Sequence, residues 1–193
     1  SEACDDGWGS LEEPLNKLHT TVQADHSITV ITRNTSPDLG FDRSINAYRG
    51  CEHGCAYCFA RPTHAFLGLS SGQDFESRIF AKHGAHALLA RELSDPKYQC
   101  RMIALGTNTD PYQPTERRLE ITRNILSVLS QYEHPVEIVT KSALVTRDID
   151  ILDAMARRNL AKVVLSLTTL DSELARRRWK QHGTAPSDAW REP

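Results

Sequence analysis

The sequence lacks a long hydrophobic run, and no apolar stretch approaches the roughly 18–20 residues of a membrane-spanning helix. It shows no secretory signal at its start. It also lacks an excess of charge of one sign, because the formal net charge is −2 at pH 7. This balance argues against a strongly cationic, non-specific nucleic-acid-binding protein. A local basic patch is not excluded by it, since one dense basic run comprises Arg176, Arg177, Arg178 and Lys180.

Cysteine is scarce and unevenly placed, with five residues, of which three fall within eight positions. A secreted disulfide framework usually has an even number of cysteines that are spread along the chain. The clustering instead indicates a metal site in a reducing compartment. We therefore expect a cytoplasmic protein without a membrane segment. Cys4 and Cys100 have no motif around them and are expected to be incidental.

Strand-like and helix-like segments alternate along most of the chain. We predict strands at 27–33, 44–49, 102–105, 136–139 and 161–167, and helices at 83–93, 116–132, 147–158 and from 173 to 178 onward. Apolar strands separated by amphipathic helices are typical of βαβ units that form a parallel sheet. The predicted fold class is therefore α/β.

The length points to an incomplete barrel. An eightfold (β/α) barrel takes about 250 residues, and about four βα units follow residue 43 in this chain of 193 residues. We predict a partial (β/α) TIM-type barrel with a parallel sheet, truncated after those units. The expected domains are an N-terminal extension at 1–42, a partial-barrel core at 43–178 and an irregular tail at 179–193. Because the tail has neither a strand nor a helical pattern, we expect that the chain is a fragment, or that its reading frame changes near Arg176.

The segment R-G-C-E-H-G-C-A-Y-C-F-A-R-P at 49–62 carries the densest chemistry. Its cysteines, Cys51, Cys55 and Cys58, have the spacing C-x3-C-x2-C, and thiolates suit both iron–sulfur clusters and zinc. A structural zinc site requires four ligands, whereas three thiolates on a [4Fe-4S] cluster leave one iron open for a substrate. The glycines at 50 and 54 let the backbone pass close to a bulky group.

Two alternatives to the iron–sulfur cluster stay open at this stage. The first is zinc, with His53, His64 or Cys100 as the fourth ligand. The second is a cysteine cluster that binds no metal. His64 and Asp74 follow the cysteine segment and are expected to be structural.

Polar segments follow the later predicted strands at the points where those strands end. They are G-T-N-T-D-P-Y-Q-P at 106–114, T-K-S at 140–142 and S-L-T-T at 166–169. In parallel α/β folds, ligands bind at the carboxyl ends of the strands. We therefore expect these segments and the segment at 49–62 that carries the three cysteines, called the cysteine loop, to face one site.

The cysteine segment resembles the C-x3-C-x-aromatic-C motif of the radical S-adenosylmethionine superfamily, with Tyr57 in the aromatic position. The resemblance implies that Cys51, Cys55 and Cys58 ligate a [4Fe-4S] cluster and that Tyr57 packs beside the adenine of S-adenosylmethionine. Over roughly 43–175 the chain resembles the spore photoproduct lyase-like branch, often labelled "DNA repair photolyase". The residues that carry this second resemblance are 106–114 and R-P-T-H at 61–64.

The resemblance also implies contacts to the cofactor. The amino group of S-adenosylmethionine would meet Thr107, Asn108, Thr109 and Asp110, whose oxygens are suitable acceptors for an ammonium group. Lys141 would neutralise the carboxylate of the cofactor, and Ser166 would bond its ribose or carboxylate. The plainer alternatives are a proline-bounded turn at 106–114, a solvated lysine and a satisfied strand hydroxyl.

The implied function is reductive cleavage of S-adenosylmethionine at a [4Fe-4S] cluster to a 5′-deoxyadenosyl radical, which acts on an unknown substrate. The implied partner is a low-potential electron donor of the flavodoxin or ferredoxin type. Nucleic acid enters as a substrate by family analogy alone. Spore photoproduct lyase uses a cysteine hydrogen-atom donor, for which this sequence has no clear counterpart. The alternative function is a non-catalytic iron–sulfur or zinc-binding module, as in a truncated, inactive relative.

Overall fold

The computed structural model describes residues 19–167 and 169. The predicted helix at 173–178, the basic run, the tail at 179–193 and Cys4 lie outside the described residues. Within the described part, no helix is long and apolar enough to cross a membrane.

The larger of two sheets has five strands in the order β2-β3-β6-β7-β8. Its four parallel strands are β3 (Arg43–Ile45), β6 (Ile103–Leu105), β7 (Val136–Thr140) and β8 (Ala161–Leu165). β2 (Ile31–Arg33) adds to β3 in the antiparallel direction. The register aligns Ile45 with Leu105, and Leu105 with Ile138, so apolar side chains form rows on one face. The described fold is thus mixed α/β with a mostly parallel sheet, and closure into a partial barrel stays a prediction.

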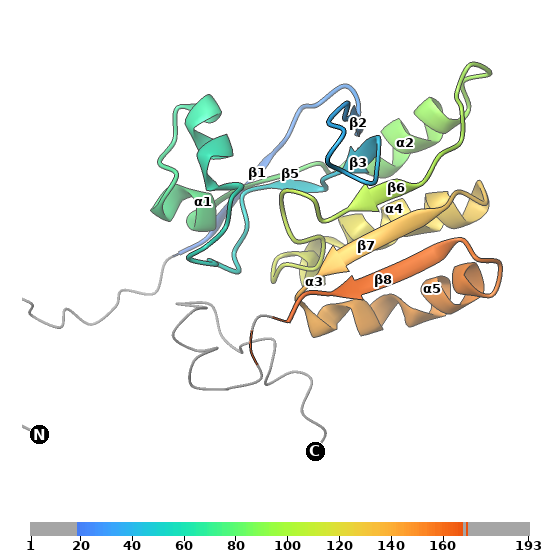
Figure 1. Ribbon diagram of the computed structural model, residues 1–193. Helices are drawn as coiled ribbons and strands as arrows, with labels where there is room; N and C mark the ends of the chain where they lie inside the picture. The colour runs from blue at the N-terminus through green and yellow to red at the C-terminus, as the bar shows by residue number, and fades with distance from the viewer. Residues whose placement is uncertain (1–18, 168, 170–193) are drawn as a thin grey trace, which may run out of the picture.

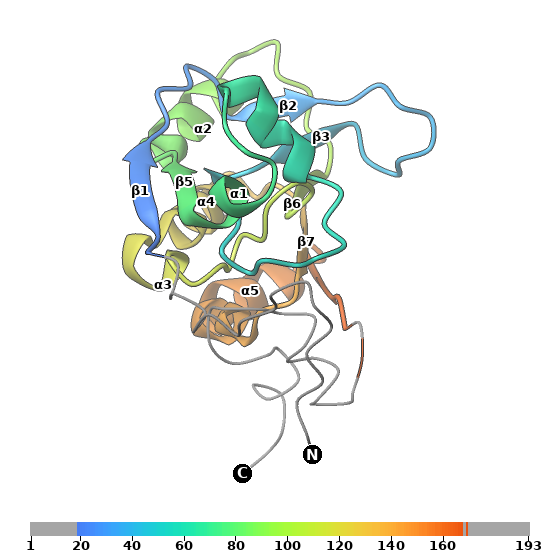
Figure 2. The same cartoon turned by 90° about the vertical axis from the view of Figure 1, so that its left-hand side faces the viewer.

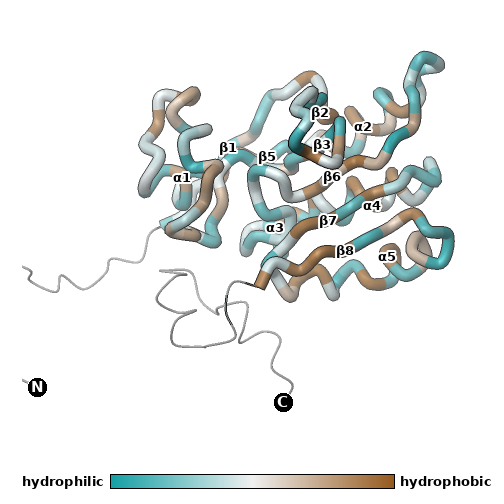
Figure 3. The backbone as a smooth tube through the Cα atoms, in the orientation of Figure 1, coloured by the Kyte–Doolittle hydropathy of each residue, from teal (hydrophilic) through white to brown (hydrophobic). Residues whose placement is uncertain are grey.

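Three helices cover one face of this sheet, as Figure 1 shows. They are α2 (Ala85–Leu93), α4 (Ile121–Gln131) and α5 (Ile149–Ala156). The core between sheet and helices is apolar, and its completely buried side chains include Leu89, Ile103, Ile125, Leu129, Ile138 and Met155. Figure 3 shows hydrophobic residues along β6, β7 and β8. The burial of these alternating apolar faces explains why the sequence folds into these layers.

A second sheet of three strands lies beside the first, in the order β1-β5-β4 (Figures 1 and 2). It comprises β1 (Thr21–Ala24), β4 (Tyr48–Arg49) and β5 (Arg78–Ala81). Between β4 and β5 the chain forms the cysteine loop, the 3₁₀ helix η1 (Arg61–Leu67) and the short helix α1 (Gln73–Ser77). This sheet therefore supports the segment that carries the three clustered cysteines.

The sequence predictions for individual elements need several corrections. The single strand predicted at 44–49 is divided between β3 and β4, which belong to different sheets. No strand is predicted where β5 lies, and β1 lies within the predicted N-terminal extension at 1–42, where no strand is expected before residue 27. The helix predicted at 116–132 is α3 (Glu116–Leu119) followed by α4, with Glu120 between them at φ 52°. The helix predicted at 147–158 begins as the 3₁₀ helix η2 (Ala143–Asp148) and continues as α5.

Candidate functional site

The cysteine loop begins at Gly50, directly after β4. Gly50 has φ 80°, and a Cβ there would lie 2.9 Å from both His64 Cε1 and the Phe75 carbonyl oxygen. The next amide, of Cys51, donates to that Phe75 oxygen at 2.9 Å. The loop is therefore pressed against α1, and a side chain at position 50 would displace it.

Two of the three clustered cysteines are buried, Cys51 at 7% and Cys55 at 8% exposure, and Cys58 is half-buried. Burial raises the pKa of the Cys51 thiol well above its ordinary value. The nearby Asp110 carboxylate and Cys55 act in the same direction, while backbone hydrogen bonds from Asp110 and His53 oppose it. A thiol in such a place becomes a thiolate when a cation binds it. Cys51 thus offers a soft ligand that carries charge once a metal binds it.

The three cysteine thiols of the loop are of the donor type that iron–sulfur clusters take. Across residues 19–167 and 169, no group of three His, Cys, Asp or Glu side chains converges on one metal-ion position. A zinc ion requires such convergence, because all its ligands bind one atom. In a [4Fe-4S] cluster each cysteine binds a different iron, so the three sulfur atoms stay further apart.

The second part of the site is the polar loop, residues 106–114, which follows β6. Its first residue, Gly106, has φ 89°, and a Cβ there would overlap the Val139 carbonyl oxygen on β7. Asn46, just past β3, then fixes the next two residues. Its Nδ2 donates to Thr107 Oγ1 at 3.1 Å, and its Oδ1 accepts from the Asn108 amide at 3.0 Å. Asn46 is not among the predicted site residues, although its position directly after β3 is of the kind that predicts such residues.

Asp110 joins the polar loop to the end of β7. One carboxylate oxygen accepts from Thr140 Oγ1 at 2.6 Å and the Tyr112 amide at 2.9 Å, and the other accepts from the Lys141 amide at 2.9 Å. Because Asp110 also lies beside Cys51, it stands between the cysteine loop and β7. Three hydrogen bonds leave a carboxylate with little further acceptor capacity. The structure therefore shows Asp110 joining the polar loop to β7, and its expected contact with the cofactor amino group stays a prediction.

The remaining predicted contact residues lie around the same edge of the sheet. Thr109 is buried, and its hydroxyl donates to the Tyr48 carbonyl at 3.2 Å. Lys141 is half-buried just past β7, and the Ser166 amide, just past β8, donates to Thr140 O at 2.9 Å. Tyr57 is 45% exposed on the cysteine loop. The ends of β6, β7 and β8 therefore do meet at one edge, and the cofactor contacts of these residues stay predictions.

Gln113 and Glu52 connect the cysteine loop to the polar loop, and neither is among the predicted site residues. The Glu52 amide donates to Gln113 Oε1 at 2.9 Å, and Gln113 Nε2 donates to the Gly50 carbonyl at 3.3 Å. Glu52 in turn accepts from the Thr115 amide at 2.6 Å. The signal in the sequence was the position of Gln113 in the same loop as Asp110.

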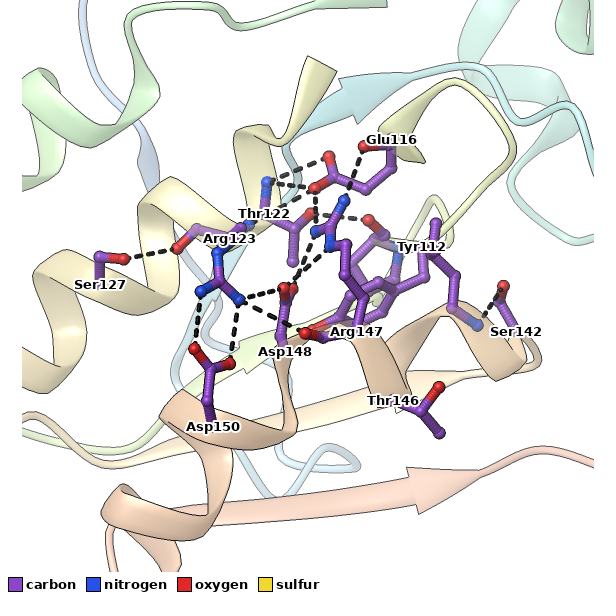
Figure 4. A network of polar contacts seen from close by, with 12 residues as sticks. Tyr112, Glu116, Thr122, Arg123, Ser127, Ser142, Thr146, Arg147, Asp148 and Asp150 are labelled. Atoms are coloured by element: carbon purple, nitrogen blue, oxygen red, sulfur yellow. Dashed lines mark hydrogen bonds and ion pairs between the residues drawn. The ribbon is translucent and has the colours of Figure 1, made fainter. Parts of the chain in front are cut away.

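A buried ionic network lies beside the polar loop and links α3, η2 and the start of α4 (Figure 4). Glu116 and Asp148 are both fully buried, and Arg147 contacts them at 2.8 Å and 2.9 Å. Glu116 also accepts from the hydroxyl of Tyr48, while Arg123 pairs with Asp148 at 2.8 Å. Through these contacts the network holds the start of α4 against η2.

The other candidate ligands have separate environments. Cys100 is exposed and precedes β6, so it lies at the amino end of that strand. His64 is fully buried behind Gly50, where its Nε2 contacts the Arg78 carbonyl oxygen at 3.0 Å. Asp74 accepts from the Ser70 amide at 2.8 Å. His53 lies closest to the cysteines, with Nδ1 3.6 Å from Cys51 Sγ. The structural roles expected for His64 and Asp74 agree with these contacts.

Comparison with known proteins places this site in a wider group. The family model described as "Radical SAM superfamily" matches residues 45–190. The uncharacterized proteins Rv2578c of Mycobacterium tuberculosis and Mb2609c of Mycobacterium bovis are each 41% identical to the chain over 138 residues, which are 72% of this chain and 41% of each relative.

A more distant relative comes from an archaeon. The uncharacterized protein MJ0683 of Methanocaldococcus jannaschii is 31% identical over 110 residues, which are 55% of this chain and 38% of that protein. The chain thus spans about two fifths of the length of these curated relatives. No solved structure matches it.

Proposed function

The chain belongs to the radical SAM superfamily, and from this premise we propose that it binds a [4Fe-4S] cluster through Cys51, Cys55 and Cys58 and reductively cleaves S-adenosylmethionine. The observation that carries the proposal is the position of the cysteine loop against the polar loop, with Cys51 beside Asp110. A cluster on the first loop would then stand next to the proposed amino-group acceptors on the second.

The chemistry of the site divides between the cofactors and the chain. Cys51, Cys55 and Cys58 would hold the [4Fe-4S] cluster, which when bound and reduced would supply the electron for cleavage of S-adenosylmethionine to methionine and a 5′-deoxyadenosyl radical. The residues of the chain bind, orient and shield these groups. The hydroxyl of Thr107 and the amide of Asn108 stand on a loop that Asn46 and Gly106 hold in one conformation.

Lys141 would bind the carboxylate of S-adenosylmethionine, and Ser166 would bind its ribose or its carboxylate. The Lys141 ammonium stands just past β7, where it would offset a carboxylate charge at the edge of the sheet. Ser166 follows β8 next to it, as the bond from its amide to Thr140 O indicates. Tyr57 would cover the adenine, because a half-exposed aromatic ring offers an apolar stacking surface.

The finer assignment to the spore photoproduct lyase-like branch is also a proposal. It rests on the segments at 61–64 and 106–114, and the relatives carry names that state no reaction. We propose a flavodoxin- or ferredoxin-type electron donor, a cytoplasmic location and a substrate still to be identified. Nucleic acid is a candidate substrate by analogy alone.

Metal content after anaerobic reconstitution tests the proposal. The chain is incubated with ferrous iron, sulfide and an equal amount of zinc, and the bound metals are then quantified. We expect about four irons per chain, with loss of iron in Cys55→Ala. Cys100→Ser is the matched control, because Cys100 is exposed at the other end of the sheet and should leave the iron content unchanged. Zinc without iron would favour the alternative of a zinc-binding module.

A further inference from the structure

The amide of Gln113 is fully buried, and both its ends contact the cysteine loop. Its Oε1 accepts from the Glu52 amide, and its Nε2 donates to the Gly50 carbonyl. A backbone amide can only donate and a carbonyl can only accept, so these partners fix which way the side-chain amide faces. Glu52 completes the connection by accepting from the Thr115 amide. We call these three hydrogen bonds the Gln113–Glu52 bridge.

The bridge surrounds one cysteine in particular. Its two contacts on the cysteine loop, Gly50 and Glu52, are the neighbours of Cys51 on either side. On the opposite side, the Cys51 amide donates to Phe75 O at 2.9 Å. The backbone of Cys51 is therefore fixed by α1 from one direction and by Gln113 from the other. Because the bridge is buried, water cannot replace a lost partner without a rearrangement of the loop.

We propose that Gln113 is a positioning residue that sets Cys51, and with it the cluster, relative to the cofactor-binding face of the polar loop. The inference rests on the proposed function, since it names what couples the two halves of that site. In the proposed arrangement Gln113 contacts neither the cluster nor S-adenosylmethionine. It acts through Gly50 and Glu52, so its loss should move the cysteine loop while the sheet and helices stay folded.

The first test uses the metal-free protein and measures the rate of alkylation of each cysteine by iodoacetamide. Cys51 is buried, so its reaction requires the loop to open. In Gln113→Leu we expect Cys51 to react about tenfold faster or more, because tenfold corresponds to the loss of about one net hydrogen bond. Exposed Cys100 serves as the internal reference and should keep its rate. An unchanged rate at Cys51 would overturn the inference.

Thr122→Val is the matched control variant. Thr122 is also buried, and its hydroxyl donates to the Pro111 carbonyl at 2.6 Å, so the change removes a buried hydrogen bond from the same polar loop. It does not touch the cysteine loop. We expect Thr122→Val to lower the melting temperature about as much as Gln113→Leu and to leave the alkylation rate of Cys51 unchanged. Equal acceleration in both variants would mean general destabilisation and would contradict a positioning role.

The second test uses the reconstituted protein and follows the electron paramagnetic resonance spectrum of the reduced cluster during titration with S-adenosylmethionine. We expect about tenfold weaker cofactor binding in Gln113→Leu and an altered spectrum at saturation. Wild-type affinity and spectrum in that variant would refute the inference alone. A wild-type chain that binds no iron would refute the proposed function and the inference together.

A second pair of variants covers the case in which Gln113→Leu does not fold. Glu52→Gln keeps an oxygen that accepts from the Thr115 amide, whereas Glu52→Leu removes it. We expect Glu52→Gln to retain wild-type alkylation and cofactor binding, and Glu52→Leu to show both defects. Indistinguishable behaviour of the two Glu52 variants would overturn the bridge as a positioning device.

Discussion

Replacement of Gly106 by alanine should be strongly destabilising, because two separate costs coincide at this position. A non-glycine residue in the left-handed region costs about 1–2 kcal/mol, and Gly106 has φ 89°. The new Cβ would also overlap the Val139 carbonyl oxygen on β7, and overpacking of this kind costs about 1–3 kcal/mol. Together the free energy of unfolding should fall by about 2–5 kcal/mol, which lowers the melting temperature by on the order of 10 °C.

Two other glycines separate these costs. Gly68 has φ 70° but no neighbouring atom within 4 Å of a Cβ, so Gly68→Ala should lose only about 1–2 kcal/mol. Gly40 has neither a positive φ nor a close neighbour, so Gly40→Ala should stay within about 0.5 kcal/mol of wild type. Urea unfolding of the three variants measures the series. If Gly106→Ala is no less stable than Gly68→Ala, the close approach of the polar loop to β7 is wrong.

Further predictions concern buried charge. Arg147→Leu leaves two completely buried carboxylates, Glu116 and Asp148, without their shared partner, so the free energy of unfolding measured in urea should fall by about 3–5 kcal/mol. Arg157→Leu is the control, because it removes only an exposed ion pair and should lower the free energy of unfolding by less than about 0.5 kcal/mol. Equal losses in the two variants would contradict the role of the network. Burial lowers the pKa of His134, with the nearby Arg43 charge acting in the same direction. The unfolded chain therefore binds a proton more readily, so stability should fall as pH drops from about 7 through the lowered pKa. In His134→Gln that decline should flatten, and identical pH profiles would refute the assignment.

The sequence predicted the elements whose pattern is set by burial alone. Strands expected at 102–105 and 136–139 are found as β6 and β7, and the helix expected at 83–93 is α2. The predicted helix at 116–132 is interrupted for a reason that periodicity does not contain. The buried Glu116 carboxylate accepts from the backbone amides of Thr122 and Arg123, so a side chain of the preceding helix α3 binds the free amides at the start of α4.

For the site, too, one part could be predicted from the sequence and another part could not. Its location at the ends of parallel strands followed from strand order, and the loops after β6, β7 and β8 do meet there. The residues that hold those loops together could not be predicted from strand order, because Asn46 and Gln113 bind partners about 60 positions away in the sequence. The division of the predicted strand at 44–49 between β3 and β4 was also unexpected, since a two-residue strand such as β4 carries no periodic signal. Long-range hydrogen bonds of this kind become visible only in the folded chain.

Formation of 5′-deoxyadenosine is the most direct test of the central claim that the cysteine loop holds a cluster which cleaves S-adenosylmethionine. The reconstituted chain is incubated without oxygen with dithionite and S-adenosylmethionine, and the products are separated and quantified. We predict 5′-deoxyadenosine and methionine in equal amounts from the wild-type chain and neither product from Cys55→Ala. A wild-type chain that holds about four irons and forms no 5′-deoxyadenosine would contradict it.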